Sequence, residues 1–131
     1  MKSQSSLPPP RGAFSRVRSV RMGDSRLLFV SGIAASRETP PGALEQTEII
    51  FQTIDSLLRE HGSSLRDVVK ITAFLADIGD YAAYNSVRNR IFADHPSPPA
   101  SSTVEARLVE PKFRVEVEAI AIPGSAGAGD A

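Results

Sequence analysis

The sequence predicts a single α+β domain, in which a mixed β-sheet carries two helices on one face. Apolar residues recur at the three-and-four spacing of amphipathic helices over 44–58 and 80–92. Runs of β-branched and aromatic residues of strand length precede, separate and follow these two segments. The predicted order is therefore β, β, α, β, α, β, β, in which each helix can cross over between strands of one sheet.

Length and charge favour one domain without a polyanionic partner. A chain of 131 residues can bury roughly two thirds of its unfolded surface and so fold on one core. Fifteen basic and fifteen acidic residues are interspersed and cancel, so neither nucleic acid nor an anionic membrane is an expected partner. Residues 1–14 and 123–131 are poor in large apolar residues and are expected to be flexible tails around a domain over 15–122.

The composition also excludes several kinds of catalytic and metal site and predicts the cellular compartment of the protein. The absence of cysteine excludes disulfides, a thiol nucleophile and thiolate metal sites. His61 and His95 stand alone near the ends of predicted helices, which favours a capping role over metal ligation or catalysis, so no metal site is expected. No segment approaches the roughly 20 apolar residues of a membrane span, and the N-terminus lacks a signal-peptide pattern. A cytoplasmic protein is therefore expected.

The first half of the domain is expected to form a hairpin, a loop and a helix. Val17–Met22 and Leu27–Val30 are β-prone runs on either side of the turn residues 23–25. Residues 33–43 include a Thr-Pro-Pro-Gly stretch that breaks regular structure. The helix that follows has its apolar positions at Leu44, Ile50, Phe51, Ile54, Leu57 and Leu58. Gly62 stands where the C-terminal cap of this helix belongs.

The second half is expected to add three strands and a helix. Val68–Leu75 is a short, β-branched apolar run and is predicted to be a central strand. Asp80 is placed to cap the second helix. The apolar positions of that helix are Tyr81, Tyr84, Val87, Ile91 and Phe92. The proline-rich segment 96–99 ends it, and two further strands are predicted over 101–108 and 112–122.

The last predicted strand has two unlike faces. Side chains alternate along a strand, which puts Phe113, Val115, Val117, Ala119 and Ala121 on one face. The other face holds Arg114, Glu116, Glu118, Ile120 and Ile122. This second face mixes carboxylates with branched apolar side chains, so it is expected to meet a subunit or a ligand. Since two helices can cover only one side of the sheet, a symmetric oligomer is expected to cover the other.

Four segments, taken in order, carry a family resemblance. They are Phe29–Gly32, Gly62–Lys70, Asp77–Tyr81 with Asn85, and Val115–Ala121. Together they resemble the reactive-intermediate deaminase family, also called Rid, RidA or YjgF-like, over residues 15–122. The resemblance implies a chorismate-mutase-like subunit (the Rid/YjgF fold), a homotrimer whose sheets face inward as a barrel, and ligand clefts between subunits. It also implies hydrolysis of imines and enamines made by pyridoxal-phosphate enzymes, with release of ammonia and a keto acid and without metal or organic cofactor.

The resemblance assigns site residues by motif position. Ser31 lies at the family's cleft serine, Asn85 at its helix asparagine and Glu116 at the glutamate that holds or activates water. The family's arginine, which grips the substrate carboxylate, follows a Pro-Ala pair before the penultimate strand, and here that pair is followed by Ser101. The chain thus resembles a divergent member without this arginine. A serine hydroxyl cannot replace two charge-assisted hydrogen bonds.

Two other arginines are candidates for a displaced anion anchor. Arg88 lies three residues after Asn85 and therefore on the same face of the predicted helix. Arg16 stands where the resemblance implies an aromatic residue before the first strand. Ser101 and Thr103 are expected to shape and polarise the same site.

Each candidate also has a structural alternative. Glu116 is either a proton carrier, with a pKa raised by burial, or one half of an interface ion pair. Glu118 is expected at an interface rather than at the chemistry. Asn85 either orients substrate or caps local backbone, and Ser31 either offers its hydroxyl or permits a tight turn.

Two further groups are expected to be structural. A Ser–His arrangement of Ser101 or Ser102 with His95 is disfavoured, because no partner base is identifiable. Tyr81 and Tyr84, at helical spacing, are expected in the core or an interface.

These residues favour a cofactor-free enzyme that acts on an imine, enamine or related carbon–nitrogen electrophile in a trimer-interface cleft. Hydrolysis, tautomerisation and cyclodehydration all need proton transfer around a held carbon–nitrogen or carbonyl centre, so the sequence leaves all three open. Without the arginine, standard 2-imino acids are not the expected substrates. The alternative is a non-catalytic small-molecule-binding or chaperone-like trimer, and the neutral charge balance disfavours RNA cleavage.

Overall fold

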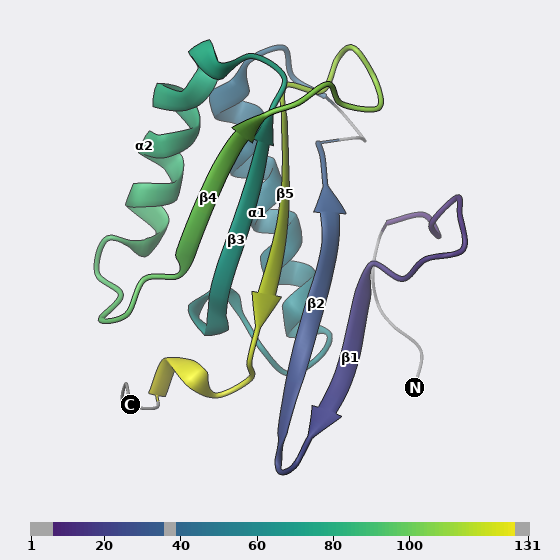
Figure 1. Ribbon diagram of the computed structural model, residues 1–131, viewed down its shortest axis with the longest axis vertical. Coiled ribbons are helices and arrows are strands. Elements are labelled where there is room, and N and C mark those ends of the chain that lie inside the picture. Colours follow the sequence, from purple (N-terminus) through teal and green to yellow (C-terminus); the bar gives the residue numbers. More distant parts are fainter. Residues whose placement is uncertain (1–6, 36–38, 128–131) are drawn as a thin grey trace.

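The computed structural model describes residues 7–35 and 39–127 and has the predicted α+β architecture (Figure 1). One five-stranded sheet has the order β1-β2-β5-β3-β4. The pair β3 and β4 is parallel, whereas the other neighbours in the sheet are antiparallel. The sheet is therefore mixed, as predicted. Parts of the predicted tails, and of the loop predicted over 33–43, lie outside the described residues.

The opening hairpin is confirmed, with a longer second strand than the sequence predicts. It consists of β1 (Val17–Met22) and β2 (Ser25–Ile33). Met22 pairs with Ser25, so Ser25 belongs to the strand rather than to the turn. The pairing of β2 with β5 is irregular between Val30 and Ile33, where Ser31 and Gly32 form a bulge opposite the single residue Glu118.

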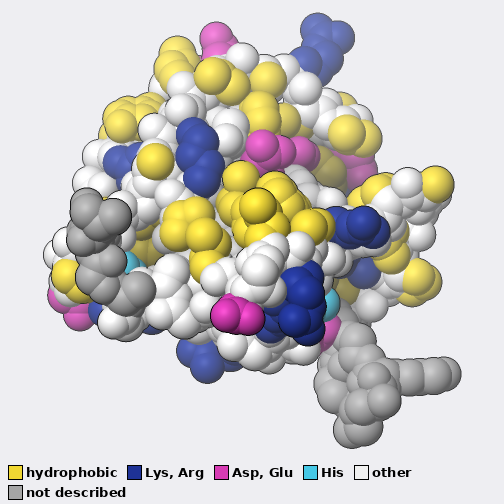
Figure 2. Space-filling model, turned by 60° about the horizontal axis from the view of Figure 1, so that its bottom comes forward, with side chains coloured by type: hydrophobic (Ala, Val, Ile, Leu, Met, Phe, Trp, Pro, Cys, Tyr) yellow, Lys and Arg dark blue, Asp and Glu magenta, His cyan; other side chains and the backbone are white. Residues whose placement is uncertain are grey.

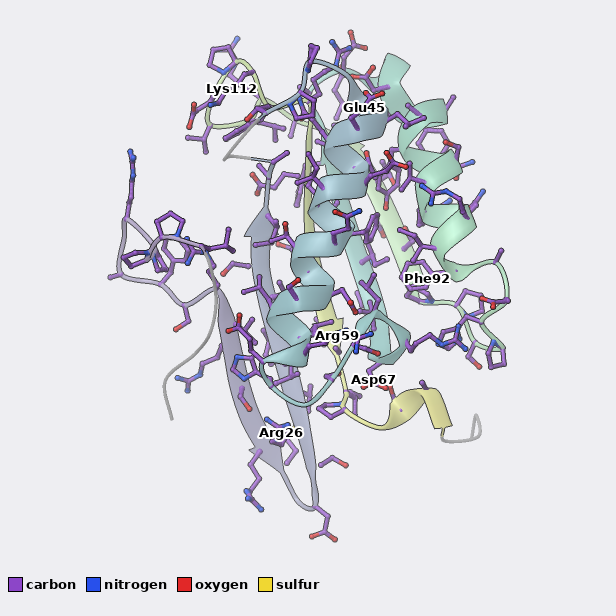
Figure 3. All side chains as sticks on the ribbon, turned by 180° about the vertical axis from the view of Figure 1, so that it is seen from behind. Arg26, Glu45, Arg59, Asp67, Phe92 and Lys112 are labelled. Carbon is purple, nitrogen blue, oxygen red and sulfur yellow. The ribbon has the colours of Figure 1, made fainter. Side chains whose placement is uncertain are left out.

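Both predicted helices are present and lie on the same face of the sheet (Figure 3). They are α1 (Ala43–Arg59) and α2 (Tyr81–Phe92). Gly62 follows α1 at φ +74°, a left-handed conformation that suits glycine. There the amide of Ser63 donates to the carbonyl of Leu58 at 3.0 Å. This confirms the predicted glycine cap.

The predicted capping role of Asp80 is wrong. Asp80 precedes α2, but its carboxylate makes no side-chain hydrogen bond to the helix amides. It accepts instead from Nε and Nη2 of Arg114, both at 2.9 Å. The ion pair with Arg114 has taken the carboxylate that a cap would use, and it joins the start of α2 to the segment entering β5.

The later strands differ from the prediction mainly at their ends. β3 (Val68–Leu75) lies between β5 and β4, so it is an interior strand, although β5 (Val115–Ala121) is the middle one. β4 (Ala100–Glu105) and β5 are both shorter than predicted, because residues 106–114 form a loop between them. Short 3-10 turns occur at Leu65–Asp67, Ile78–Asp80 and Ser125–Gly127.

The core lies between the sheet and the two helices, and one face of the sheet stays open. The predicted core face of β5 is buried, with Val115, Val117 and Ala121 fully enclosed. On its other face Glu116 and Ile120 are half-buried and Glu118 is exposed. Figure 2, which brings the lower end of the sheet forward, shows hydrophobic side chains gathered in the middle of the view with charged side chains close around them. Within residues 7–35 and 39–127, no helix covers this face of the sheet.

One buried polar side chain fixes the entry to β5. Gln46 on α1 is fully buried, and its Nε2 donates to the carbonyls of Pro40 at 2.7 Å and Lys112 at 3.0 Å. Its Oε1 accepts from the amide of Arg114 at 2.9 Å. These bonds hold the loop before β5 against the helix, and thereby set where Glu116 lies.

The histidines have structural contacts. Nδ1 of His95 accepts from the amide of Ser97 at 2.9 Å, so Nε2 carries the proton and donates to the carbonyl of Arg66 at 2.7 Å. His61 acts through its backbone, since its carbonyl accepts from Arg26 at 2.7 Å. His95 therefore fastens the chain after α2 by hydrogen bonds rather than by a charge at the helix end.

Candidate functional site

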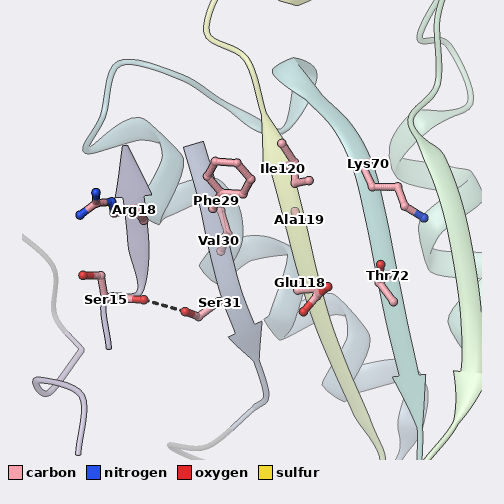
Figure 4. A pocket seen from close by; sticks show the side chains of 10 residues that line it. All are labelled: Ser15, Arg18, Phe29, Val30, Ser31, Lys70, Thr72, Glu118, Ala119 and Ile120. Carbon is pink, nitrogen blue, oxygen red and sulfur yellow. Dashed lines mark hydrogen bonds between the residues drawn. The ribbon is translucent and has the colours of Figure 1, made fainter. Parts of the chain in front are cut away.

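The open face of the sheet is hollowed by a cavity of about 540 Å³ (Figure 4). Strand pairing explains its lining, because Ile120 of β5 lies opposite both Phe29 and Lys70, and Glu118 lies opposite Thr72. The remaining side chains around it include Ser15, Arg18 and Ser31. The cavity thus joins an apolar floor to acidic, basic and hydroxyl groups. Lys70 and Phe29 are not among the predicted site residues, although strand alternation could have found them, and Glu118 is predicted at an interface only.

Glu116 lies on this open face, two residues before Glu118. Its carboxyl group rests against the backbone of Gly32 in the bulge of β2, where a β-carbon would lie 2.9 Å from the carboxyl carbon. Burial raises the pKa of Glu116 above that of an ordinary glutamate, and the negative charge of Glu118 raises it further. A half-buried carboxylate with a raised pKa is suited to taking up and returning a proton.

The arginine that shares the strand face with Glu116 is already paired with another carboxylate. Arg114 shares the strand face with Glu116, but it is engaged by Asp80 of the same chain. No ion pair of Glu116 occurs among the residues that the structure describes.

Ser31 and Arg16 are joined by a backbone hydrogen bond. The amide of Ser31 donates to the carbonyl of Arg16 at 2.8 Å, which extends the β1–β2 ladder by one position. The Ser31 hydroxyl donates to the carbonyl of Ser15 at 2.6 Å. Its proton is therefore used to anchor the chain before β1, and only its oxygen lone pairs can face a ligand.

A second polar cluster lies between α2 and β4. Arg88 donates from Nη1 to the hydroxyl of Ser101 at 3.1 Å and from Nη2 to the amide oxygens of Asn85 and of Asn89, the latter at 3.1 Å. Its guanidinium carbon lies 5.5 Å from the ring centroid of Tyr84, a cation–π contact. Asn85 therefore orients Arg88. Thr103 pairs with Ala73 on the same helix-facing side of the sheet.

The chain does not bring all the predicted site residues together. Glu116 pairs with Phe74 of β3, which pairs with Val104 of β4, so Ser101 lies two strands away from Glu116 and three residues further along the sheet. Ser101 pairs with the buried Ile71 and faces the helices, whereas Glu116 points to the open face. Glu116, Ser31 and Arg16 thus form one half of a candidate site, and Asn85, Arg88, Ser101 and Thr103 form the other.

Other chemistries find little support in the described part of the chain. The ring nitrogens of His95 are both bonded to backbone groups, and the hydroxyl of Ser102 accepts from Lys70 at 3.1 Å, so neither residue serves a Ser–His pair. No cluster of three or more acidic or histidine side chains with metal-binding geometry occurs among the described residues. In the same ranges, no helix is long and apolar enough to cross a membrane.

Known proteins resemble this chain along most of its length. The family profile described as Endoribonuclease L-PSP matches residues 5–123. A RutC family protein of Haemophilus influenzae is 36% identical over 97 residues, which cover 74% of this chain and 83% of that protein. The 2-iminobutanoate/2-iminopropanoate deaminase of Capra hircus is 33% identical over 104 residues, covering 76% of this chain and 74% of that enzyme.

Solved structures share the fold. The crystal structure of yeast Mmf1 aligns with a TM-score of 0.76 at 29% identity, covering 88% of this chain and 90% of that chain. NMB1025 of Neisseria meningitidis, a member of the YjgF protein family, aligns with a TM-score of 0.68 at 32% identity, covering 88% and 97%. The expected Rid/YjgF fold is confirmed. One relative, MMF1 of Saccharomyces cerevisiae, is named a mitochondrial protein, so the cytoplasmic expectation stays a prediction.

Proposed function

The chain belongs to the family described as Endoribonuclease L-PSP, whose members also carry the names RidA, YjgF and RutC, and from this we propose that it hydrolyses a carbon–nitrogen double bond. The substrate is an imine, or an enamine that becomes an imine when a proton is added to its carbon. No metal or organic cofactor is required. The observation that carries the proposal is the half-buried carboxylate of Glu116, with a raised pKa, on the open face of the sheet and two residues from Glu118, which lines the cavity.

Glu116 transfers the proton in each step of this reaction. Its carboxylate takes a proton from water as the water oxygen bonds to the imine carbon, and it gives this proton to the imine nitrogen, which forms a neutral carbinolamine. Glu116 then takes the proton of the carbinolamine hydroxyl and gives it to the nitrogen as the carbon–nitrogen bond breaks, which releases ammonia and leaves a carbonyl group. Water and imine are consumed, ammonia and carbonyl compound are formed, and Glu116 returns to its starting state.

The complete site forms between subunits of a homotrimer. Two observations support this part of the proposal. The Glu116 half and the Ser101 half lie on opposite faces of the same sheet, so two chains can supply what one cannot. The open face also exposes large apolar side chains, with Phe29 40% and Val104 45% exposed, which a neighbouring subunit would cover.

The substrate differs from a standard 2-imino acid. The goat relative is named for 2-iminobutanoate and 2-iminopropanoate, but Ser101 stands where the family resemblance places the carboxylate-gripping arginine. Loss of that bidentate contact removes two charge-assisted hydrogen bonds, each of about 1.5–3 kcal/mol. We therefore expect slow turnover of 2-aminoacrylate and faster turnover of an imine that carries additional binding groups.

A screen of imines and enamines tests the proposal. Amino-acid oxidases or pyridoxal-phosphate enzymes generate them in situ, and ammonia release and product mass are followed together. Acceleration of ammonia release from at least one imine supports hydrolysis. Loss of the mass of one water without ammonia would indicate cyclodehydration at the same carboxylate, and a change in the absorbance spectrum without ammonia or a change of mass would indicate tautomerisation. Saturable binding without any turnover would favour the non-catalytic alternative. Rapid turnover of 2-aminoacrylate would contradict the assignment based on Ser101.

A further inference from the structure

Arg114 is held at three points just before β5. Its amide donates to Oε1 of Gln46 at 2.9 Å, and its carbonyl accepts from the amide of Ala76 at 3.0 Å. Its guanidinium donates from Nε and Nη2 to the two carboxylate oxygens of Asp80, both at 2.9 Å. Two parallel bonds of this kind fix the direction of an arginine side chain as well as its distance. The backbone of Arg114 is thus set by Gln46 and Ala76, and the direction of its side chain is set by Asp80.

The same backbone position puts the guanidinium within reach of Glu116. Arg114 and Glu116 are two residues apart in an extended segment, about 7 Å along the strand, and they share one face of it. An arginine side chain is long enough to bridge that distance. Asp80 stands on the other side, at the start of α2. Arg114 could therefore pair with either carboxylate, and in the structure it pairs with Asp80.

Two negative charges hold the guanidinium on the α2 side. The hydrogen bond to Asp80 and the charge of Asp80 raise the pKa of Arg114, and the charge of Asp77 adds to the rise. The Asp80 side chain is only 16% exposed, so water competes little for its oxygens. Arg114 itself is exposed, and its side chain can turn if Asp80 is removed.

The immediate neighbours of Glu116 include no other cation. On β3 it pairs with Phe74, and on the β2 side its carboxyl group lies against the backbone of Gly32. The next residue on the same face of β5 is Glu118, which is itself negative. Burial raises the pKa of Glu116 and Glu118 raises it further, and no positive charge among the described residues opposes them.

Other basic residues in and around this part of the sheet are Arg16, Arg18, Lys70, Arg107 and Lys112. Arg16 and Arg18 lie beyond β2, and Arg107 follows β4, which lies beyond β3. Lys70 pairs with Ile120, four residues beyond Glu116. Lys112 is paired with Glu110 at 3.8 Å. Arg114 is therefore the described cation that most directly reaches Glu116.

We propose that Asp80 is a positioning residue that holds Arg114 away from Glu116 and so leaves Glu116 able to take up and return a proton. A guanidinium beside a carboxylate stabilises the ionised form, so a free Arg114 would make Glu116 a weaker base. Asp80 acts through Arg114 and needs no contact with a substrate. The inference rests on the proposed function only for its effect on turnover, because the titration of Glu116 can be measured without any turnover.

Two variants break this ion pair and leave different groups behind. Asp80→Asn leaves Arg114 charged and free to turn toward Glu116, whereas Arg114→Gln removes the cation. If the ion pair merely joins α2 to the segment before β5, the two variants should affect Glu116 alike. If Asp80 holds the cation away, Asp80→Asn should lower the pKa of Glu116 and Arg114→Gln should not.

The titration of the Glu116 carboxyl carbon, followed by NMR in the full-length carbon-13-labelled protein, measures this difference. Glu116→Gln assigns the signal. Asp80→Asn is expected to lower the midpoint by about one pH unit, and the shift should shrink at high salt because Arg114 is exposed. Arg114→Gln and the double variant Asp80→Asn/Arg114→Gln should titrate like the wild type.

Two further variants complete the test. Glu48→Gln is the matched control, because it frees Arg90 from an ion pair on the helix face and should leave the Glu116 midpoint in place. Arg114→Lys keeps the charge and the native start of α2 but loses the two parallel bonds to Asp80. It should lower the midpoint by less than Asp80→Asn, and it tests the same point if Asp80→Asn does not fold.

An unchanged midpoint in both Asp80→Asn and Arg114→Lys would overturn the inference, and so would equal shifts in Asp80→Asn and Arg114→Gln. A failure of the proposed function gives a different result. A lower midpoint in Asp80→Asn, in a protein that turns over no imine, would refute the proposed function alone. Turnover that depends on Glu116, with the same Glu116 midpoint in the wild type and Asp80→Asn, would refute this inference alone.

Discussion

The carboxyl group of Glu116 lies against the backbone of Gly32, where a β-carbon would stand 2.9 Å from the carboxyl carbon. Only a residue without a side chain leaves the carboxylate in its present position. The contact joins β2 and β5 at the irregularity between Val30 and Ile33, so the bulge determines where the proposed proton carrier lies.

Gly32→Ala is therefore expected to lower turnover about 10- to 100-fold by displacing the Glu116 carboxylate, in the range found for a misplaced catalytic group. The fold should persist, because Gly32 is exposed and the Glu116 side chain can move toward solvent. Steady-state kinetics and circular dichroism measure both effects. Gly127→Ala, which would meet no atom within 4 Å, is the control. Unchanged kinetics in Gly32→Ala would show that the position of the carboxylate does not matter.

Glu118→Gln is expected to shift the pH–rate profile to lower pH. Glu118 contributes a negative charge that raises the pKa of Glu116, so removing the charge lowers that pKa. If ionised Glu116 is the base, turnover rises with pH as Glu116 loses its proton. The rising part of the pH–rate profile therefore moves to lower pH together with the pKa of Glu116. The shift should shrink at high salt, since Glu118 is exposed. Glu110→Gln, in the loop before β5, should leave the profile in place; a shift to higher pH in Glu118→Gln would contradict the assignment.

Glu116→Gln is expected to stabilise the protein at neutral pH. The pKa of Glu116 is raised in the folded state, so the folded state holds this proton more tightly than the unfolded chain. Below the ordinary glutamate pKa of about 4.3 both states are protonated, and the stabilising contribution is fully present. It is lost as the pH rises through the folded pKa. The melting temperature of the wild type should fall relative to Glu116→Gln over that range; an opposite trend would mean that a cation stabilises the ionised form.

Gln46→Leu is expected to lower the free energy of unfolding by about 1–3 kcal/mol. The change leaves the carbonyls of Pro40 and Lys112 and the amide of Arg114 without their buried partner. Urea denaturation measures the loss. Gln52→Leu, at an exposed position of the same helix, should have a much smaller effect. Equal losses in the two variants would mean that the Gln46 hydrogen bonds add nothing beyond the side-chain volume.

The sequence predicted regular elements best where periodicity and chain breakers agree. The apolar positions of α2 and the proline-rich segment 96–99 set both of its ends. The strand ends around 106–114 could not be predicted, because Val109 is β-prone yet 88% exposed in a loop, and Phe113 and Arg114 continue the alternation of β5. Alternation alone does not show where strand pairing stops.

The site was predictable in its parts and not in its arrangement. Motif position predicts Glu116, Asn85 and Ser31 as candidate site residues, but their division between two faces depends on the strand order β5-β3-β4, which the sequence pattern does not provide. Tyr84 was predicted in the core or an interface and is fully buried, but only the three-dimensional contacts reveal that its ring lies against the guanidinium of Arg88. Asp80 was misassigned because its ion-pair partner Arg114 lies 34 positions away in sequence.

Ammonia release from an imine generated in situ, compared between the wild type and Glu116→Gln, tests the central claim most directly. Gln matches Glu in size but cannot accept and return a proton at the pH of the assay. We predict a loss of turnover of about 100-fold or more, as expected for removal of a general acid–base, with assembly state and ligand affinity retained. Turnover by Glu116→Gln at the wild-type rate would contradict the account.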